Sequence, residues 1–136
     1  MFCLRPILQQ LYRNETFEYP LALRYQRLEI LDLQLNRIGP EGAMALAYAI
    51  RHSAALQVVN LKHNLTGDFG GTAFGWMLAM NKSVVDLTLA ANHMQLDSAK
   101  GFAKALGVNT TLRRLDLSNN ILGKVRSCVD AASLML

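Results

Sequence analysis

LRRLDLSNNIL, residues 112–122, is the last of four stretches that share one pattern of leucine and asparagine. The earlier three are LEILDLQLNRI (28–38), LQVVNLKHNLT (56–66) and VVDLTLAANHM (84–94), so each copy starts 28 residues after the previous one. Leucine or valine fills the first, fourth and sixth positions of every copy, and asparagine fills the ninth. A fixed period of this length indicates a stack of similar structural units.

The fourth and sixth positions are separated by one polar or variable residue, which predicts a short strand that is buried on one face. Stacked copies would pair these strands in parallel. The ninth-position asparagine follows the strand, where its amide can both donate to and accept from backbone groups. We therefore expect a structural asparagine ladder formed by Asn36, Asn64, Asn92 and Asn120.

The second half of each repeat changes to helical spacing, with apolar or small residues at i, i+3, i+4 and i+7. The expected inward positions are Ala43, Leu46, Ala47 and Ile50, then Gly71, Phe74, Gly75 and Leu78, then Ala99, Phe102, Ala103 and Leu106. Pro40 and Asp97 are typical of helix N-termini. Thr66 stands where the eleventh position is otherwise apolar, so we expect a local rearrangement of that turn.

A 28-residue L-x-x-L-x-L-x-x-N repeat followed by such a helix resembles the ribonuclease-inhibitor-like leucine-rich repeats. ALGVNTTLRRLDLSNN is similar to the junction between two repeats of that family. The resemblance covers residues 28–122 and implies an α/β leucine-rich repeat solenoid. Such a solenoid is a partial right-handed horseshoe with a parallel sheet on its concave face and helices on its convex face.

The expected organisation is a helical cap or degenerate repeat over residues 1–27, then four repeats over 28–136 that start at 28, 56, 84 and 112. Leu4, Ile7, Leu8 and Leu11 have helical spacing in the first segment. In the last repeat the regular inward positions are Ser127, Asp130, Ala131 and Leu134, and burying Asp130 would be costly. A shift by two residues instead turns Val125, Cys128, Val129 and Ala132 inward.

Cys3 and Cys128 lie near opposite ends of the chain, which fits neither a disulfide framework nor a zinc site. Cys128 is then a small core residue. The final SLML is a poor polar cap for a repeat stack. We expect that another protein covers this end, that the chain continues, or that end-to-end self-association occurs through the C-terminal repeat.

The Asn-x-Ser/Thr sequons of the repeat region begin at Asn64, Asn81 and Asn109. Asn64 belongs to the ladder, while Asn81 and Asn109 follow helix ends, where asparagine tolerates a left-handed backbone. We therefore expect structural roles rather than glycosylation. The first residues do not fit a signal peptide, and an apolar run of about 18 residues is absent, which predicts an intracellular, cytoplasmic location.

The net charge is +4, and residues 100–126 carry the excess. A mildly basic end suits an acidic protein surface at least as well as nucleic acid. His52, His63 and His93 have no acid or thiol partner at a recognisable spacing. We expect a non-enzymatic protein with no catalytic residue, cofactor, metal or small-molecule substrate, and no membrane association.

Two surfaces are candidates for a protein partner. The expected concave face has apolar residues at one end and charged residues at the other, and consists of Ile30, Asp32, Val58, Asn60, Lys62, Asp86, Thr88, Arg113, Arg114 and Asp116. The alternative is that Arg113 and Arg114 only pair with acidic residues on neighbouring strands. A possible second surface contains Tyr48 and Trp76, for which the alternative is packing between helices.

The expected function is that of a scaffold or regulatory adaptor, which binds a protein of unknown identity on the concave face. An alternative is regulation of a small GTPase, because Ran GTPase-activating proteins resemble these repeats too. Nucleic-acid binding through the basic C-terminal end is a weaker alternative, since the strands lack interleaved aromatic residues.

Overall fold

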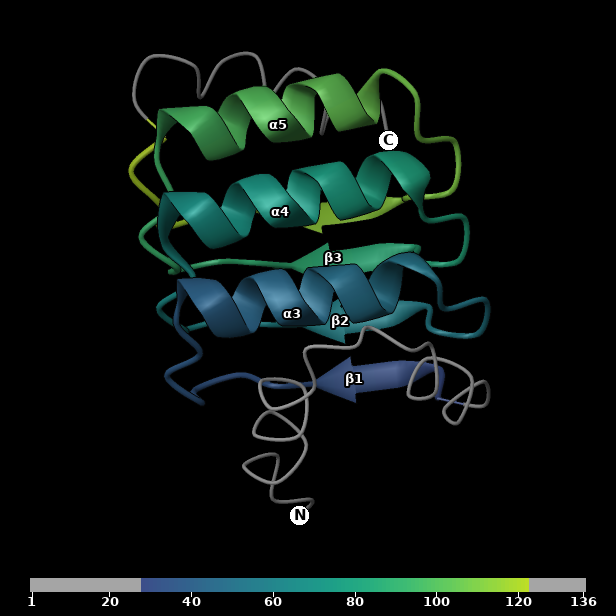
Figure 1. The fold of residues 1–136 in the computed structure, drawn as a ribbon, viewed down its shortest axis with the longest axis horizontal. Helices are drawn as coiled ribbons and strands as arrows, with labels where there is room; N and C mark the ends of the chain where they lie inside the picture. Colours follow the sequence, from purple (N-terminus) through teal and green to yellow (C-terminus); the bar gives the residue numbers. More distant parts are fainter. Residues whose placement is uncertain (1–27, 123–136) are drawn as a thin grey trace.

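Strands and helices alternate along residues 28–122, which are the residues that the computed structural model describes. The order is β1 (Ile30–Asp32), α3 (Pro40–Arg51), β2 (Val58–Asn60), α4 (Gly67–Met80), β3 (Asp86–Thr88), α5 (Leu96–Leu106) and β4 (Arg114–Asp116). Figure 1 shows these helices side by side in one layer, in front of a second layer that contains the strands. None of the described helices is long and apolar enough to cross a membrane.

Several expectations concern the two ends of the chain. The cap expected over residues 1–27 lies outside the described residues, as does Cys3. Both arrangements of the last helix fall within residues 123–136, which also lie outside, together with Cys128. The division into a cap and four complete repeats therefore stays a prediction.

The described strands form one parallel sheet in the order β1-β2-β3-β4. Paired Cα positions are 28 residues apart throughout, as in Leu31 with Val59 and Leu87 with Leu115. This register confirms the parallel sheet that the repeat predicts. Because side chains alternate between the two faces of a strand, these four residues face the helices, and the residues on either side of them face away.

The core lies between the two layers. The sixth-position leucines are all buried, and so are the expected inward residues of α3 and α4. Burial of these leucine and phenylalanine side chains stabilises the fold by roughly 1.5–3 kcal/mol for each residue. The fully buried side chains of largest volume are Phe74, Phe102, Leu33, Leu61, Met77 and Leu78.

The last described helix departs from the expected pattern. Ala99 and Phe102 of α5 are buried as expected, but Ala103 is exposed and Leu106 is only half-buried. The expectation for Ala103 was wrong. The same column of α4 holds Gly75, which α5 covers closely, whereas no described helix lies on the other side of α5 (Figure 1). Burial at this position therefore depends on the neighbouring helix.

The asparagine ladder is present, and it joins each repeat to the one before it. The side-chain amide of Asn64 donates to the carbonyls of Leu33 and Leu61, at 2.9 Å each. Its Oδ1 accepts from the backbone N–H groups of Asn36 at 3.1 Å and Ile38 at 2.9 Å. One side chain thereby satisfies buried backbone groups in two successive turns, which would otherwise cost about 1–3 kcal/mol each.

The later members of the ladder follow the same scheme. Asn92 donates to the Leu61 carbonyl at 2.8 Å, and Asn120 donates to the Leu89 carbonyl at 2.9 Å. Asn36 is exposed, and its amide donates to the Gln34 carbonyl of its own turn at 2.9 Å. The ladder expected from the sequence is confirmed, with Asn36 as its exposed first member.

The turn after β2 is rearranged, as the presence of Thr66 predicts. α4 begins at Gly67, one repeat position earlier than α3 and α5 begin. The Gly67 N–H donates to the Asn92 carbonyl at 2.9 Å, while the Thr66 N–H reaches Asn92 Oδ1 only at 3.4 Å. Thr66 is fully buried, and its hydroxyl has no hydrogen-bond partner within residues 28–122.

Candidate functional site

The sheet face that points away from the helices carries two rows of equivalent side chains. Strand pairing aligns Ile30, Val58, Asp86 and Arg114 in one row, and Asp32, Asn60, Thr88 and Asp116 in the other. We call these eight residues the open sheet face. Neighbouring strands are about 4.8 Å apart, so each row spans roughly 14 Å. The strand register thus brings together most of the residues expected to bind a partner.

The first row changes from apolar to charged along its length. The Ile30 side chain is 64% exposed, and Val58 beside it is half-buried. At the other end the Arg114 guanidinium forms an ion pair with the Asp86 carboxylate on the neighbouring strand. The hydrogen bond from Arg114 to this carboxylate raises the pKa of Arg114 above its ordinary value. The alternative of cross-strand pairing therefore holds for Arg114.

Arg113 behaves differently from Arg114. Its side chain is exposed and forms no hydrogen bond or ion pair with residues 28–122. Asp116, another acidic residue of the open sheet face, accepts the backbone N–H of Ser118 at 2.9 Å. Arg113 therefore has its charge available to a binding partner.

Three residues of the second row form hydrogen bonds that stabilise the turn after their own strand. Asp32, Asn60 and Asp116 each accept the N–H of the residue two positions later, at 3.0, 3.1 and 2.9 Å. This short-range hydrogen bond is a typical use of Asp and Asn where a strand ends. Sequence reasoning assigned these side chains to partner binding and missed this structural role. Lys62, at the strand exit after Asn60, is half-buried.

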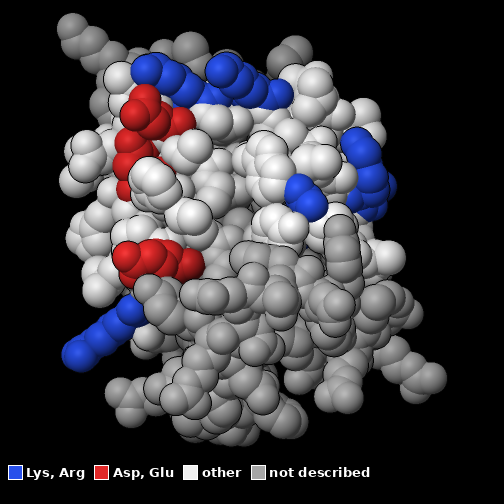
Figure 2. Space-filling view, viewed as in Figure 1, with Lys and Arg blue, Asp and Glu red and all other residues white. Residues whose placement is uncertain are grey.

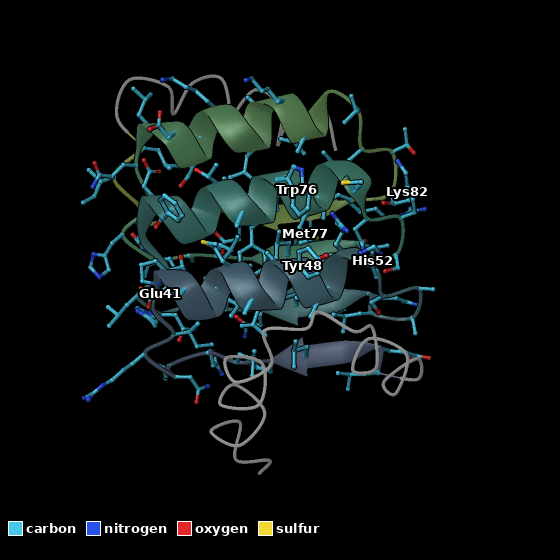
Figure 3. The ribbon with its side chains drawn as sticks, viewed as in Figure 1. Glu41, Tyr48, His52, Trp76, Met77 and Lys82 are labelled. Carbon is cyan, nitrogen blue, oxygen red and sulfur yellow. The ribbon has the colours of Figure 1, made fainter. Side chains whose placement is uncertain are left out.

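The helix layer presents a second cluster of side chains, at the C-terminal ends of α3 and α4 (Figure 3). The rings of Tyr48 and Trp76 are stacked, with centroids 6.5 Å apart and an angle of 19° between the planes. Tyr48 is half-buried, but Trp76 is 47% exposed. Packing between helices, the alternative for this pair, therefore describes Tyr48 better than Trp76.

Arg51 belongs to the same cluster and was not singled out from the sequence. Its guanidinium carbon lies 4.8 Å from the Tyr48 ring centroid and 4.6 Å from that of Trp76. A cation at these distances is attracted to the face of an aromatic ring. Arg51 follows Tyr48 by three residues on α3, so helical spacing from Tyr48 could have pointed to it.

A second feature that sequence reasoning missed is a cap that α4 provides for α5. The Asp68 carboxylate accepts backbone N–H groups of Gln95 at 3.0 Å, Asp97 at 3.2 Å and Ser98 at 2.7 Å. Burial acts to raise the pKa of Asp68, but the hydrogen bonds from Ser98, Gln95 and Asp97 outweigh it and hold the pKa below its ordinary value. Asp97, expected as the helix signal, lies in the first turn and pairs with Lys100.

The sequon asparagines of the described residues have structural roles, although not by the expected backbone conformation. Asn81 is buried, and its amide donates to the Ile50 carbonyl at 2.9 Å. Asn109 is buried and donates to the Leu78 carbonyl at 2.7 Å. Asn81 has an extended backbone with φ −71°, so the expected left-handed conformation was wrong for it. Side-chain hydrogen bonds to the preceding repeat replace the backbone cap.

The three histidines are all exposed. Within residues 28–122 no group of three or more His, Cys, Asp or Glu side chains is placed to hold a metal ion. His63 and His93 are exposed on turns, where both have a left-handed backbone, with φ 56° and 58°. His52 lies beside Tyr48, with ring centroids 6.0 Å apart.

Comparisons with known proteins agree with the repeat. A family model described as "Leucine Rich repeat" matches residues 26–47 and 108–124. Leucine-rich repeat-containing protein 45 of Gallus gallus is 38% identical over 103 residues, which make up 74% of this chain. The chain spans only 15% of the length of that relative.

Two solved structures have the same fold. "Leiomodin-1 Actin-Binding Site 2" matches with a TM-score of 0.75 and 18% identity, over 97% of this chain and 73% of that chain. The tropomodulin C-terminal domain of Caenorhabditis elegans matches with a TM-score of 0.67 and 15% identity, over 98% and 92%. The family model and the 38% identical relative, together with the 28-residue repeat, show that the chain belongs to the leucine-rich repeat family.

Proposed function

We propose that this protein is a non-enzymatic interaction module that binds a protein partner on the open sheet face. The observation that carries the proposal is the graded row of side chains on that face. Ile30 offers exposed apolar surface at one end, and the other end offers the Asp86–Arg114 ion pair with Arg113 beside it. Apolar contact area next to fixed charges suits recognition of a protein surface.

A role as an intracellular scaffold or regulatory adaptor is the form of this function that we favour. The fold is shared with a structure whose title names an actin-binding site, which is consistent with the use of such a solenoid for protein binding. Because fold alone does not determine function, actin is not implied as the partner. The buried, hydrogen-bonded amides of Asn81 and Asn109 also favour a role without glycans.

The two alternatives have less support from the described residues. Nucleic-acid binding through the basic end would use cations that are partly neutralised, since Lys100 pairs with Asp97 and Arg114 pairs with Asp86. Regulation of a small GTPase stays a prediction, and a nucleotide hydrolysis assay would test it. The ribonuclease-inhibitor-like subtype is likewise a proposal, supported by the 28-residue register.

The experiment uses a photo-crosslinking amino acid, p-benzoylphenylalanine, in place of Ile30 on the open sheet face. The control carries the same group in place of Lys104, on the exposed side of α5. We expect a partner to crosslink through position 30 and not through position 104. A partner that crosslinks only through position 104 would contradict binding on the sheet face.

Binding of the purified partner is then measured with charge reversals. Arg113→Glu should weaken the complex about tenfold, because the side chain is exposed and forms no ion pair with the described residues 28–122. Lys104→Glu makes the same charge change on the helix layer and should leave affinity unchanged. Arg114 is a poorer probe, since its replacement would leave the half-buried Asp86 unpaired. Equal affinity of the Arg113→Glu variant and the wild type would exclude this face.

A further inference from the structure

The aromatic cluster on the helix layer has the features of a binding site that is separate from the sheet face. We define the convex cluster as Tyr48, Arg51, His52, Trp76 and Met80. Its members come from α3 and α4 and from the residue that follows α3. Figure 3 shows Tyr48, Trp76 and His52 together on one side of the helix layer, with Glu41 at the far end of α3.

The guanidinium of Arg51 is held in place, yet no acidic side chain within residues 28–122 pairs with it. Its Nε donates to His52 Nε2 at 3.0 Å, and its Nη2 lies 2.6 Å from the same nitrogen. This edge of a guanidinium is the one that binds the two oxygens of a carboxylate. An imidazole nitrogen occupies it here, and the ion pairs within residues 28–122 involve other cations. A carboxylate would be a stronger acceptor at this position.

The charges around the convex cluster favour an anionic ligand. α3 and α4 each have a single acidic residue, Glu41 and Asp68, and both lie in the first helical turn. The cluster lies at the opposite, C-terminal ends of these helices, followed by the exposed Lys82. Figure 2 shows the acidic groups of this view toward the left edge and cationic groups, without acidic ones, toward the right.

Apolar surface adjoins the guanidinium. Trp76 is 47% exposed and Met80 is 52% exposed, and the Met80 sulfur lies 4.0 Å from Arg51 Nη1. Trp, Met and Arg are the residue types that are enriched at protein interfaces, and Trp and Arg contribute most to binding. The cluster thus combines one oriented cation with contact area for an apolar side chain.

We propose that the convex cluster binds an acidic peptide segment in which a carboxylate neighbours an apolar side chain. The carboxylate would take the edge of Arg51 that His52 now occupies, and the apolar side chain would lie against Trp76 and Met80. A nucleic-acid strand fits less well, because it requires a series of cations along its backbone, and this region offers Arg51 and Lys82 beside exposed methionine. This binding does not depend on the function proposed for the sheet face.

The test is selection from a random-peptide phage library on the whole protein, with the Arg51→Ala variant used to remove non-specific binders. We expect enriched peptides to contain Asp or Glu next to an aromatic or aliphatic residue. A selected peptide is then synthesised in two forms, as found and with its Asp and Glu residues replaced by Asn and Gln. Binding is followed by the fluorescence of Trp76, the single tryptophan of the chain.

Matched variants separate a specific site from general electrostatics. Loss of the carboxylates from the peptide should weaken binding about tenfold or more, and so should Arg51→Lys, which keeps the charge but removes the two-pronged donor. Lys104→Ala removes a cation from the last turn of α5, as Arg51→Ala does for α3, and should leave affinity unchanged. Circular dichroism of each variant confirms that it is folded.

Several results would overturn this proposal. These are failure to enrich acidic peptides, equal binding of the amide form, and equal binding by the folded Arg51→Lys variant. Tighter binding of single-stranded oligothymidylate than of the peptide would indicate nucleic acid instead. A change in Trp76 fluorescence with protein concentration alone would indicate a second copy of this chain. If instead the Arg113→Glu variant loses partner binding but still binds the peptide, the two surfaces bind their ligands independently.

Discussion

Thr66 is the residue at which the repeat is least well satisfied. Its hydroxyl oxygen is buried without a hydrogen-bond partner within residues 28–122, in a column that elsewhere holds Ile38, Met94 and Leu122. An unpaired buried hydroxyl costs about 1–3 kcal/mol. The asparagines of the ladder show the opposite case, because a buried polar group that is fully paired stabilises the turn that surrounds it.

Thr66→Val should therefore raise the free energy of unfolding by about 1 kcal/mol, since it removes the unpaired hydroxyl and keeps the side-chain shape. Urea denaturation followed by circular dichroism measures the change. Thr72→Val is the control, because the Thr72 hydroxyl donates to the Asp68 carbonyl at 2.9 Å on the exposed side of α4. A lower stability of Thr66→Val than of the wild type would mean that the hydroxyl has a partner.

At the scale of elements, the distance between helices depends on α4, which contains glycine at its contacts with both neighbours. A Cβ atom added at Gly75 would lie 2.8 Å from the Gly101 carbonyl carbon, and one added at Gly70 would lie 2.7 Å from the Ala43 Cβ. The backbone of α5 therefore touches α4 directly. Gly101 of α5 faces Gly75. The nearest neighbouring atom to a Cβ added at Gly101 would be 3.7 Å away.

This asymmetry predicts opposite effects for two substitutions that face each other. Gly75→Ala should destabilise the protein by about 1–2 kcal/mol, because the backbone of α5 must move away and the gain in helix propensity is smaller than that cost. Gly101→Ala should be neutral or stabilise by up to about 1 kcal/mol, since the methyl group fits and alanine favours the helix. Thermal and urea unfolding of both variants would show whether the two signs differ; equal destabilisation would contradict the packing described.

At the scale of the whole molecule, the repeats are joined by contacts that cross from one to the next. The asparagine ladder links the turns on the strand side, and Asp68 of α4 links to the first turn of α5 on the helix side. In a repeat protein each unit contacts only its neighbours. Stability of the stack therefore depends on these cross-repeat contacts as much as on each unit.

Low pH should weaken the hydrogen bonds between the Asp68 carboxylate and the start of α5. Its pKa in the folded protein is lower than the ordinary value of 3.8, so the carboxylate stabilises the fold at pH values above about 4, and this contribution is lost as the pH falls through the lowered pKa. In urea denaturation at a series of acidic pH values, Asp68→Asn should reduce this loss of stability. Asp97→Asn is the control, because that carboxylate is exposed and paired with Lys100, and it should leave the loss of stability unchanged. If the stability of the wild type and of Asp68→Asn has the same pH dependence, Asp68 is excluded as the source.

The repeat pattern alone was enough to predict the architecture of residues 28–122. The 28-residue period placed the strands, the parallel register and the ladder asparagines correctly, because side-chain alternation and repeat length leave one way to bury the leucines and satisfy the turns. The inward residues of α3 and α4 followed for the same reason. These features are local in the chain or repeat along it.

Contacts between the helices of different repeats could not be predicted in this way, because they depend on the packing of the folded chain. The Asp68 cap, the position of Arg51 over two rings and the exposure of Ala103 all depend on which helix lies beside which. The left-handed backbone of the eighth position occurs in Leu35, His63, Ala91 and Asn119 alike. Histidine and asparagine are enriched in this conformation, but leucine and alanine rarely adopt it, so the surrounding turn imposes it, and side-chain type could not reveal it.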